Sequence, residues 1–189
     1  LGTSLAVGYD VKPPDAMINR PGLILTNNLT ETDFDIVLLN DVLDHVVDVS
    51  PVDFLKTVKA FKKPRGKLYV RCHPWTSRHG THLYRELNKA YLQLVFTEQE
   101  LLGMGLMGER VIRPMNPMAS YRSWFVDAGF RILSESTITE PVEAFFTTRP
   151  AIVRRIKEKF ADSPDPQLAA GTKFPHEIMQ IQFADFVLM

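Results

Sequence analysis

The chain has 189 residues, which is within the range of one domain, and 45% of them are hydrophobic, enough for a substantial core. Its 22 lysines and arginines balance 22 aspartates and glutamates, so no overall basic field argues for a nucleic-acid partner. The single cysteine, Cys72, excludes an intramolecular disulfide and suits a reducing compartment, so the cytoplasm is the expected location. No apolar run approaches the roughly 20 residues that a membrane span needs.

The first part of the chain predicts two short strands that end in polar residues. Leu5 to Tyr9 is apolar and is followed by Asp10. Leu23 to Leu25 is also strand-like, and Asn27 and Asn28 come soon after it. Both polar stretches also suit ordinary turns, because asparagine and aspartate favour turn geometry.

A longer pattern begins with a buried strand. Residues 36 to 39 form a continuous apolar run, which is typical of a strand covered on both faces of a parallel sheet. Asn40 and Asp41 follow it directly. Polar groups at the carboxyl ends of such strands are where open α/β sheets bind ligands. We therefore expect a site here.

A helix follows this strand and has clear start and stop signals. Ser50 can act as the N-cap, and Pro51 suits the first helical position. Residues 64 to 66, Pro-Arg-Gly, stop the helix and turn the chain. The apolar stripe of this helix consists of Phe54, Leu55, Val58 and Phe61.

The next strand, residues 67 to 72, leads into a loop that is rich in histidine. His73, His79 and His82 fall within ten residues and can titrate near neutral pH. With Cys72 they could ligate a metal, but the spacing matches no standard site. The loop could also be purely structural, with its histidines bonded to backbone. We favour a third interpretation, in which the loop forms a wall of a substrate site.

This strand–helix–strand pattern resembles the class I S-adenosylmethionine-dependent methyltransferases. That family typically shows FDxVxxxxVLxH at its fourth strand, and the matches here are Phe34–Asp35, Val42–Leu43 and His45. A turn of the form LKPGGxL leads into its fifth strand and matches Lys63 to Leu68, with Arg65 in place of a glycine. The resemblance implies a Rossmann-like, doubly wound α/β sheet that is mostly parallel with an antiparallel last strand.

The resemblance also implies roles for five residues in binding S-adenosylmethionine. An acidic residue after the second strand binds both ribose hydroxyls, because a carboxylate accepts two hydrogen bonds from a vicinal diol. That position is occupied by Asp10. Asn27 and Asn28 would face the adenine edge, Asn40 would line the methionine end, and Asp41 would lie near that end.

One family feature is missing from this sequence. The first strand and its glycine-rich loop should precede Asp10, separated from it by a helix, but only nine residues do so. We expect this single domain to be a fragment whose N-terminal part supplies that strand. The G-x-G-x-x-G at residues 103 to 108 is no substitute, because the capping box Thr97–Glu100 predicts a helix before it.

The remaining elements complete the expected sheet. Residues 76 to 118 interrupt the pattern and are predicted to form a lid. A helix that begins at Pro117 and ends before Gly129, its expected C′ residue, is followed by a strand over 130–138 and an antiparallel strand over 178–189. A helix over 151–160 also carries Arg154, Arg155, Lys157 and Lys159, a run that predicts a solvated face.

The function that the resemblance implies is methyl transfer from S-adenosylmethionine to an unidentified acceptor, with His73, His79 and His82 as candidate bases. No metal is expected to take part. One alternative is a degenerate module with a binding or structural role. Another is a different user of S-adenosylmethionine, or a nucleotide-sugar or dinucleotide enzyme on a related sheet.

Overall fold

The computed structural model describes most of the chain. The described residues are 5–9, 22–26, 28–46, 49–78, 80, 87, 89–106, 118–162 and 179–189. In chain order, the helices and strands are β1 (Ala6–Tyr9), β2 (Leu23–Thr26), β3 (Phe34–Asn40), a 3-10 turn (Leu43–His45), α1 (Pro51–Phe61), β4 (Lys62–Cys72), α2 (Leu92–Val95), α3 (Glu98–Gly103), α4 (Met118–Asp127), β5 (Ile132–Thr139), α5 (Glu143–Thr147), α6 (Pro150–Lys159) and β6 (Ile181–Leu188).

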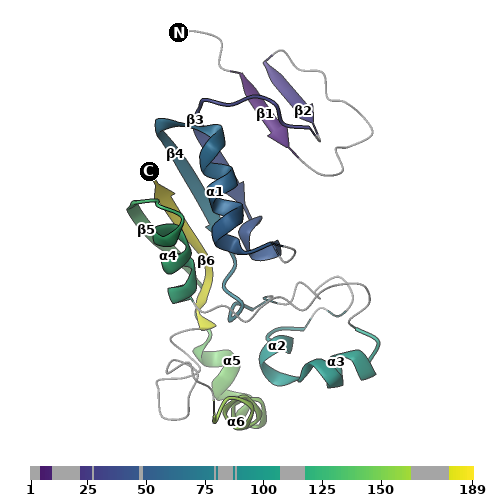
Figure 1. The fold of residues 1–189 in the computed structure, drawn as a ribbon. Helices are drawn as coiled ribbons and strands as arrows, with labels where there is room; N and C mark the ends of the chain where they lie inside the picture. Colours follow the sequence, from purple (N-terminus) through teal and green to yellow (C-terminus); the bar gives the residue numbers. More distant parts are fainter. Residues whose placement is uncertain are drawn as a thin grey trace.

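The strands form two sheets, as Figure 1 shows. The larger sheet has the order β3-β4-β6-β5, with β3 parallel to β4, and with β6 antiparallel to both β4 and β5. β1 and β2 form a separate parallel pair. The α/β class and the antiparallel last strand are confirmed. The single, mostly parallel sheet is corrected to two sheets with mixed pairing, because no described strand joins the β1–β2 pair to β3.

The described helices of the larger sheet, α1 and α4, cover one of its faces. Their buried side chains share one core with alternate residues of β3, β4 and β6. On the opposite face Ile36 is 56% exposed and Leu38 is 70% exposed. Within the described residues the sheet is therefore covered on one face, whereas a doubly wound sheet has helices on both.

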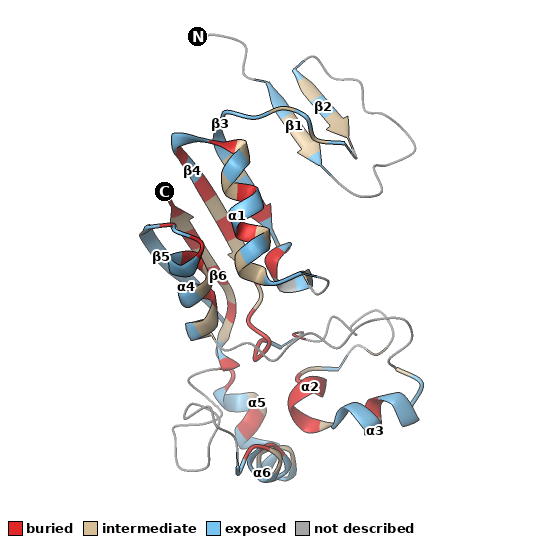
Figure 2. Cartoon of the chain, in the orientation of Figure 1, coloured by how far each residue is buried: buried red, intermediate tan, exposed pale blue. Residues whose placement is uncertain are grey.

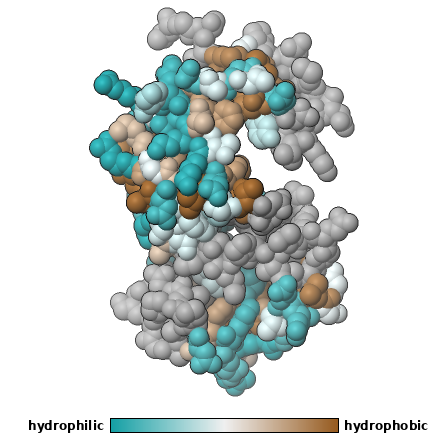
Figure 3. Space-filling view, in the orientation of Figure 1, coloured by the Kyte–Doolittle hydropathy of each residue, from teal (hydrophilic) through white to brown (hydrophobic). Residues whose placement is uncertain are grey.

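Local sequence signals explain α1. The Ser50 hydroxyl accepts a hydrogen bond from the Asp53 backbone N–H at 3.2 Å, and Pro51 occupies the first turn. Leu55 and Val58 face the core, and the opposite side of the helix is hydrophilic (Figure 3). The predicted cap and apolar stripe are confirmed.

A second core lies beyond the carboxyl ends of β3 and β4, at the bottom of Figure 1. It unites Trp75 from the segment after β4 with side chains of α2, α5 and α6. Figure 2 colours α2 and part of α5 as buried. Two excursions of the chain build this helical group, one after β4 and one between β5 and β6. None of the described helices is long and apolar enough to cross a membrane.

Gly66 marks a tight approach between β3 and β4. The pairing jumps from Phe34 opposite Lys62 to Ile36 opposite Lys67, so that residues 63–66 bulge out. A Cβ atom on Gly66 would lie 2.7 Å from the carbonyl oxygen of Phe34. Glycine is therefore needed at position 66, because a larger side chain would collide with the backbone of β3.

We expect Gly66→Ala to lower the free energy of unfolding by about 1–3 kcal/mol, because the methyl group must push β3 away. Arg65→Ala is the matched control, since Arg65 is exposed in the same turn and should change stability by no more than about 0.5 kcal/mol. Urea unfolding of both variants measures the difference. Equal stability of the two would show that the turn accommodates a side chain at position 66.

Candidate functional site

The chain turns sharply at the end of β3. Asp41 has a φ angle of 53°, in the left-handed region that aspartate tolerates better than most residues. Its backbone N–H donates to the Arg71 carbonyl at 2.9 Å, which fixes this turn to β4. The Asn40 side-chain amide donates to Asp41 Oδ2 at 3.3 Å. The amide and the carboxylate therefore lie together at the strand end.

His73 lies beside them because β3 and β4 run parallel in register, with Asn40 opposite Arg71. Its Nε2 atom is 4.0 Å from Asp41 Oδ1, and the two side chains are 19% and 29% exposed. The imidazole also packs against Phe183, with ring centroids 4.0 Å apart and planes at 43°. The ring is therefore held between a carboxylate and an aromatic side chain while part of it remains accessible.

An ion pair adjoins this group on the same face of the sheet. Arg71 donates to both carboxylate oxygens of Asp185, at 2.7 and 2.9 Å, and its guanidinium lies 5.3 Å from the centre of the Phe183 ring. The hydrogen bond from Arg71 lowers the pKa of Asp185, and the same bond raises the pKa of Arg71. The pair keeps Phe183 next to His73.

Sequence reasoning did not select Arg71 or Asp185 as site residues. A signal was present, because Arg71 and His73 are two apart on one strand and therefore share a face. Their pairing with Asp185 depends on β6 lying beside β4, between β4 and β5. That order could not be derived from the residues alone.

The structure brings together three of the eight predicted site residues, namely Asn40, Asp41 and His73. Asn28 lies elsewhere, after β2, where its backbone N–H donates to the Thr26 hydroxyl at 2.9 Å and closes a turn. The other four predicted residues lie outside the described residues: Asp10, Asn27, His79 and His82.

The polar side chains at the end of β3 can bind a cationic group of a ligand. An exposed amide and a carboxylate can both accept hydrogen bonds from an ammonium group. The neighbouring imidazole can accept a proton from a hydroxyl or an ammonium. In the described part of the chain, no three histidine, cysteine, aspartate or glutamate side chains are grouped so that they could hold a metal ion.

A separate hollow of about 470 Å³ lies between α5 and α6. Its lining includes Phe146, Val153 and Lys157, none of which belongs to the strand ends. We base the candidate site on the polar group at the strand ends, because the hollow is wide open and its described lining offers no comparable chemistry.

Comparison with known proteins agrees with this architecture. No protein-family model and no curated protein matches the sequence. Among solved structures, a putative S-adenosylmethionine-dependent methyltransferase from Listeria monocytogenes aligns with a TM-score of 0.54 and 12% identity, over 99% of this chain and 80% of that one. An S-adenosylmethionine-dependent methyltransferase from Archaeoglobus fulgidus aligns with a TM-score of 0.51 and 12% identity, over 96% and 74% of the two chains. The chain therefore has the fold of the class I S-adenosylmethionine-dependent methyltransferases.

Proposed function

We propose that this protein transfers a methyl group from S-adenosylmethionine to an acceptor whose identity is open. The observation that carries the proposal is the meeting of Asn40, Asp41 and His73 at the carboxyl ends of two parallel strands, in a chain with the methyltransferase fold. Ligands of open α/β sheets bind at this edge. The reducing cytoplasm is the proposed location, because the only cysteine is a buried free thiol.

In this proposal each residue has a distinct task. Asn40 and Asp41 hold the methionine end of the cofactor, and Asp10, Asn27 and Asn28 hold its ribose and adenine. When bound, the cofactor would supply a methyl group attached to a sulfonium sulfur, from which the methyl group is readily transferred. His73 orients the nucleophile of the acceptor and takes its proton, while Asp41 stabilises the imidazolium that results. His79 and His82 complete the acceptor wall.

The division into two sheets supports a further part of the proposal. Among the described strands, β3 has an unpaired edge and exposed apolar side chains, and a two-stranded parallel sheet such as β1–β2 is rarely stable alone. We propose that a strand from an N-terminal part of the same polypeptide pairs with both β1 and β3. A second candidate function is that of a degenerate module with a binding or structural role. If no strand pairs with β1 and β3, the division into two sheets favours this second candidate.

Cofactor binding separates the two candidates. Asp10→Ala should weaken the affinity for S-adenosylmethionine by about 1.5–3 kcal/mol, which is the range for a hydrogen bond to a charged group. The measurement is isothermal titration calorimetry on the full polypeptide. Asp127→Ala is the control, because Asp127 is exposed at the end of α4 that leads into the amino end of β5. Unchanged affinity in Asp10→Ala would exclude the ribose assignment, and no binding by the unmodified protein would favour the degenerate module.

We also propose that residues 76 to 118 cover the acceptor site as a lid; of this segment, residues 79, 81–86, 88 and 107–117 lie outside the described residues. Hydrogen exchange should show the amides of α3 opening more readily than those of β3 and β4, because α3 has one buried residue, Leu101, whereas β4 crosses the main core. Addition of S-adenosylmethionine and acceptor should slow exchange in α3. Equal protection of α3 and the sheet under both conditions would count against a lid.

A further inference from the structure

Helix α2 is too short to be stable by itself. It has four residues, Leu92 to Val95, all of which are buried. Its last carbonyl groups have no partners within the helix, as at any helix end. The carbonyl oxygens of Gln93 and Val95 instead accept hydrogen bonds from Lys159 and Arg155 of α6. The helix therefore depends on α6 for its position.

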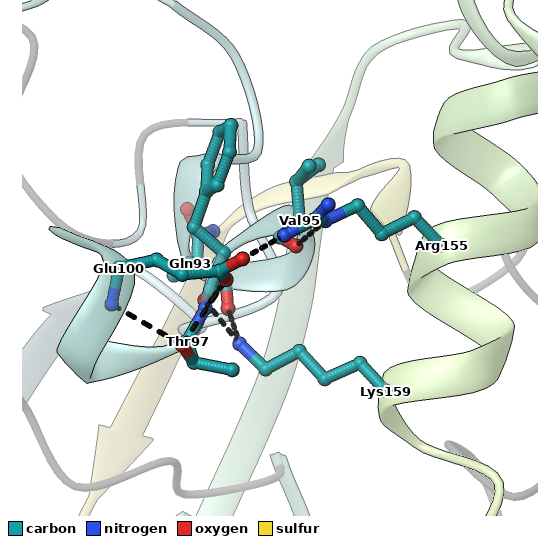
Figure 4. A network of polar contacts seen from close by, with 7 residues as sticks. Gln93, Val95, Thr97, Glu100, Arg155 and Lys159 are labelled. Atoms are coloured by element: carbon teal, nitrogen blue, oxygen red, sulfur yellow. Dashed lines mark hydrogen bonds and ion pairs between the residues drawn. The ribbon is translucent and has the colours of Figure 1, made fainter.

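Figure 4 shows how α6 holds α2. Lys159 Nζ donates to the carbonyl oxygens of Gln93 at 2.7 Å and Phe96 at 2.5 Å. Arg155 Nε donates to the carbonyl oxygen of Val95 at 2.9 Å. Lys159 is partly buried, and this burial lowers the pKa of its ammonium group. We call these two side chains the α6 clamp.

The clamp also reaches α3. Arg155 forms an ion pair with Glu100, the residue that completes the capping box with Thr97. Hydrogen bonds from Thr97 and Arg155 lower the pKa of Glu100 to about 2, so it stays ionised at neutral pH. The expected solvated face of α6 is therefore corrected for Lys159, which is partly buried. Arg154, Arg155 and Lys157 are exposed, and Arg155 in addition contacts α2 and α3.

The other side of α2 holds the loop that follows β4. Gln93 Nε2 donates to the carbonyl oxygens of Trp75 and Ser77, both at 2.7 Å, in a buried setting. The Tyr91 backbone N–H donates to the Arg78 carbonyl at 2.8 Å. His73 comes two residues before Trp75 in this same segment.

We propose that Arg155 and Lys159 are positioning residues for His73, which act by fixing α2 so that Gln93 can hold the segment between His73 and Ser77. The chain of contacts is continuous: α6 binds the carbonyls of α2, the Gln93 side chain binds Trp75 and Ser77, and Trp75 follows His73. The proposal rests on the proposed role of His73 in methyl transfer. According to this proposal, α6 helps to position the acceptor site, although it lies far from β3 in the sequence.

The test compares two double variants of one helix. Arg155→Met/Lys159→Met removes the clamp, while Arg154→Met/Lys157→Met removes two exposed charges from the same helix. The readouts are the NMR resonance of the His73 ring, assigned by its loss in His73→Asn, and hydrogen exchange of residues 74–78. We expect the clamp variant to shift the His73 resonance and speed exchange at 74–78 at least tenfold, and the control variant to change neither.

Two further variants guard against simple unfolding of the clamp variant. Lys159→Arg by itself should keep a normal His73 resonance, because arginine also donates hydrogen bonds at this position. Gln93→Leu should reproduce the shift of the clamp variant with α6 intact. A clamp variant that frees α2 and α3 in exchange but leaves His73 and residues 74–78 unchanged would overturn the proposal. Because all of these measurements omit S-adenosylmethionine, failure to bind the cofactor remains a separate result that bears only on the proposed function.

Discussion

Replacement of His73 by asparagine should lower the rate of methyl transfer by about 10²–10⁴-fold, the usual contribution of a positioned acid or base. The imidazole lies 4.0 Å from the Asp41 carboxylate and packs on Phe183, so its position is fixed from two sides. Asparagine keeps a hydrogen-bonding group but cannot accept a proton at neutral pH. The measurement is single-turnover transfer of isotope-labelled methyl groups to candidate acceptors.

The affinity for S-adenosylmethionine should stay nearly unchanged in His73→Asn, because Asn40 and Asp41 remain. The melting temperature of the same variant separates catalysis from packing. A histidine that merely fills space beside Phe183 would lower the melting temperature and leave the folded fraction fully active. A folded variant with full activity would end the catalytic assignment.

The central part of the fold was predictable because its signals are local. Ser50 and Pro51 start α1 as expected, and the apolar run before Asn40 forms β3, although among the described residues only one face of this strand is covered. The meeting of Asp41 and His73 was predictable for a related reason, since residues that follow neighbouring parallel strands share one edge of the sheet. Gly129, expected to end the helix before β5, has a φ angle of 78° and does end it.

The rest depends on contacts between distant segments. The second core joins Trp75, Phe146 and Met179, which lie on three separate stretches of the chain. Arg155 and Lys159 resemble any charged helix face in the sequence, because nothing local indicates that the carbonyls of α2 will lie beside them. The division into two sheets, in contrast, agrees with the missing first strand that the family resemblance indicated, because no described strand pairs with both β1 and β3.

Phe125→Ala should cause the largest loss of stability among the substitutions considered, about 3–5 kcal/mol. Phe125 is fully buried in α4, and its ring lies edge-on to Phe186 of β6 with centroids 4.9 Å apart. The cavity left by alanine would open between α4 and the middle of the sheet, because Phe186 pairs with Val70 of β4. His73 directly follows that strand, so the loss of packing bears on the support of the site.

Urea unfolding of Phe125→Ala measures this loss, and Val126→Ala on the same helix is the matched control. Val126 is 61% exposed, so its truncation should change the free energy of unfolding by no more than about 0.5 kcal/mol. Phe146→Ala removes a side chain of the second core and so tests whether the two cores unfold together. If they do, the urea midpoint should fall in both variants. If they unfold independently, the amides of the sheet should stay protected from exchange in Phe146→Ala. A loss in Phe125→Ala no larger than that in Val126→Ala would mean that α4 does not hold the sheet as the structure shows.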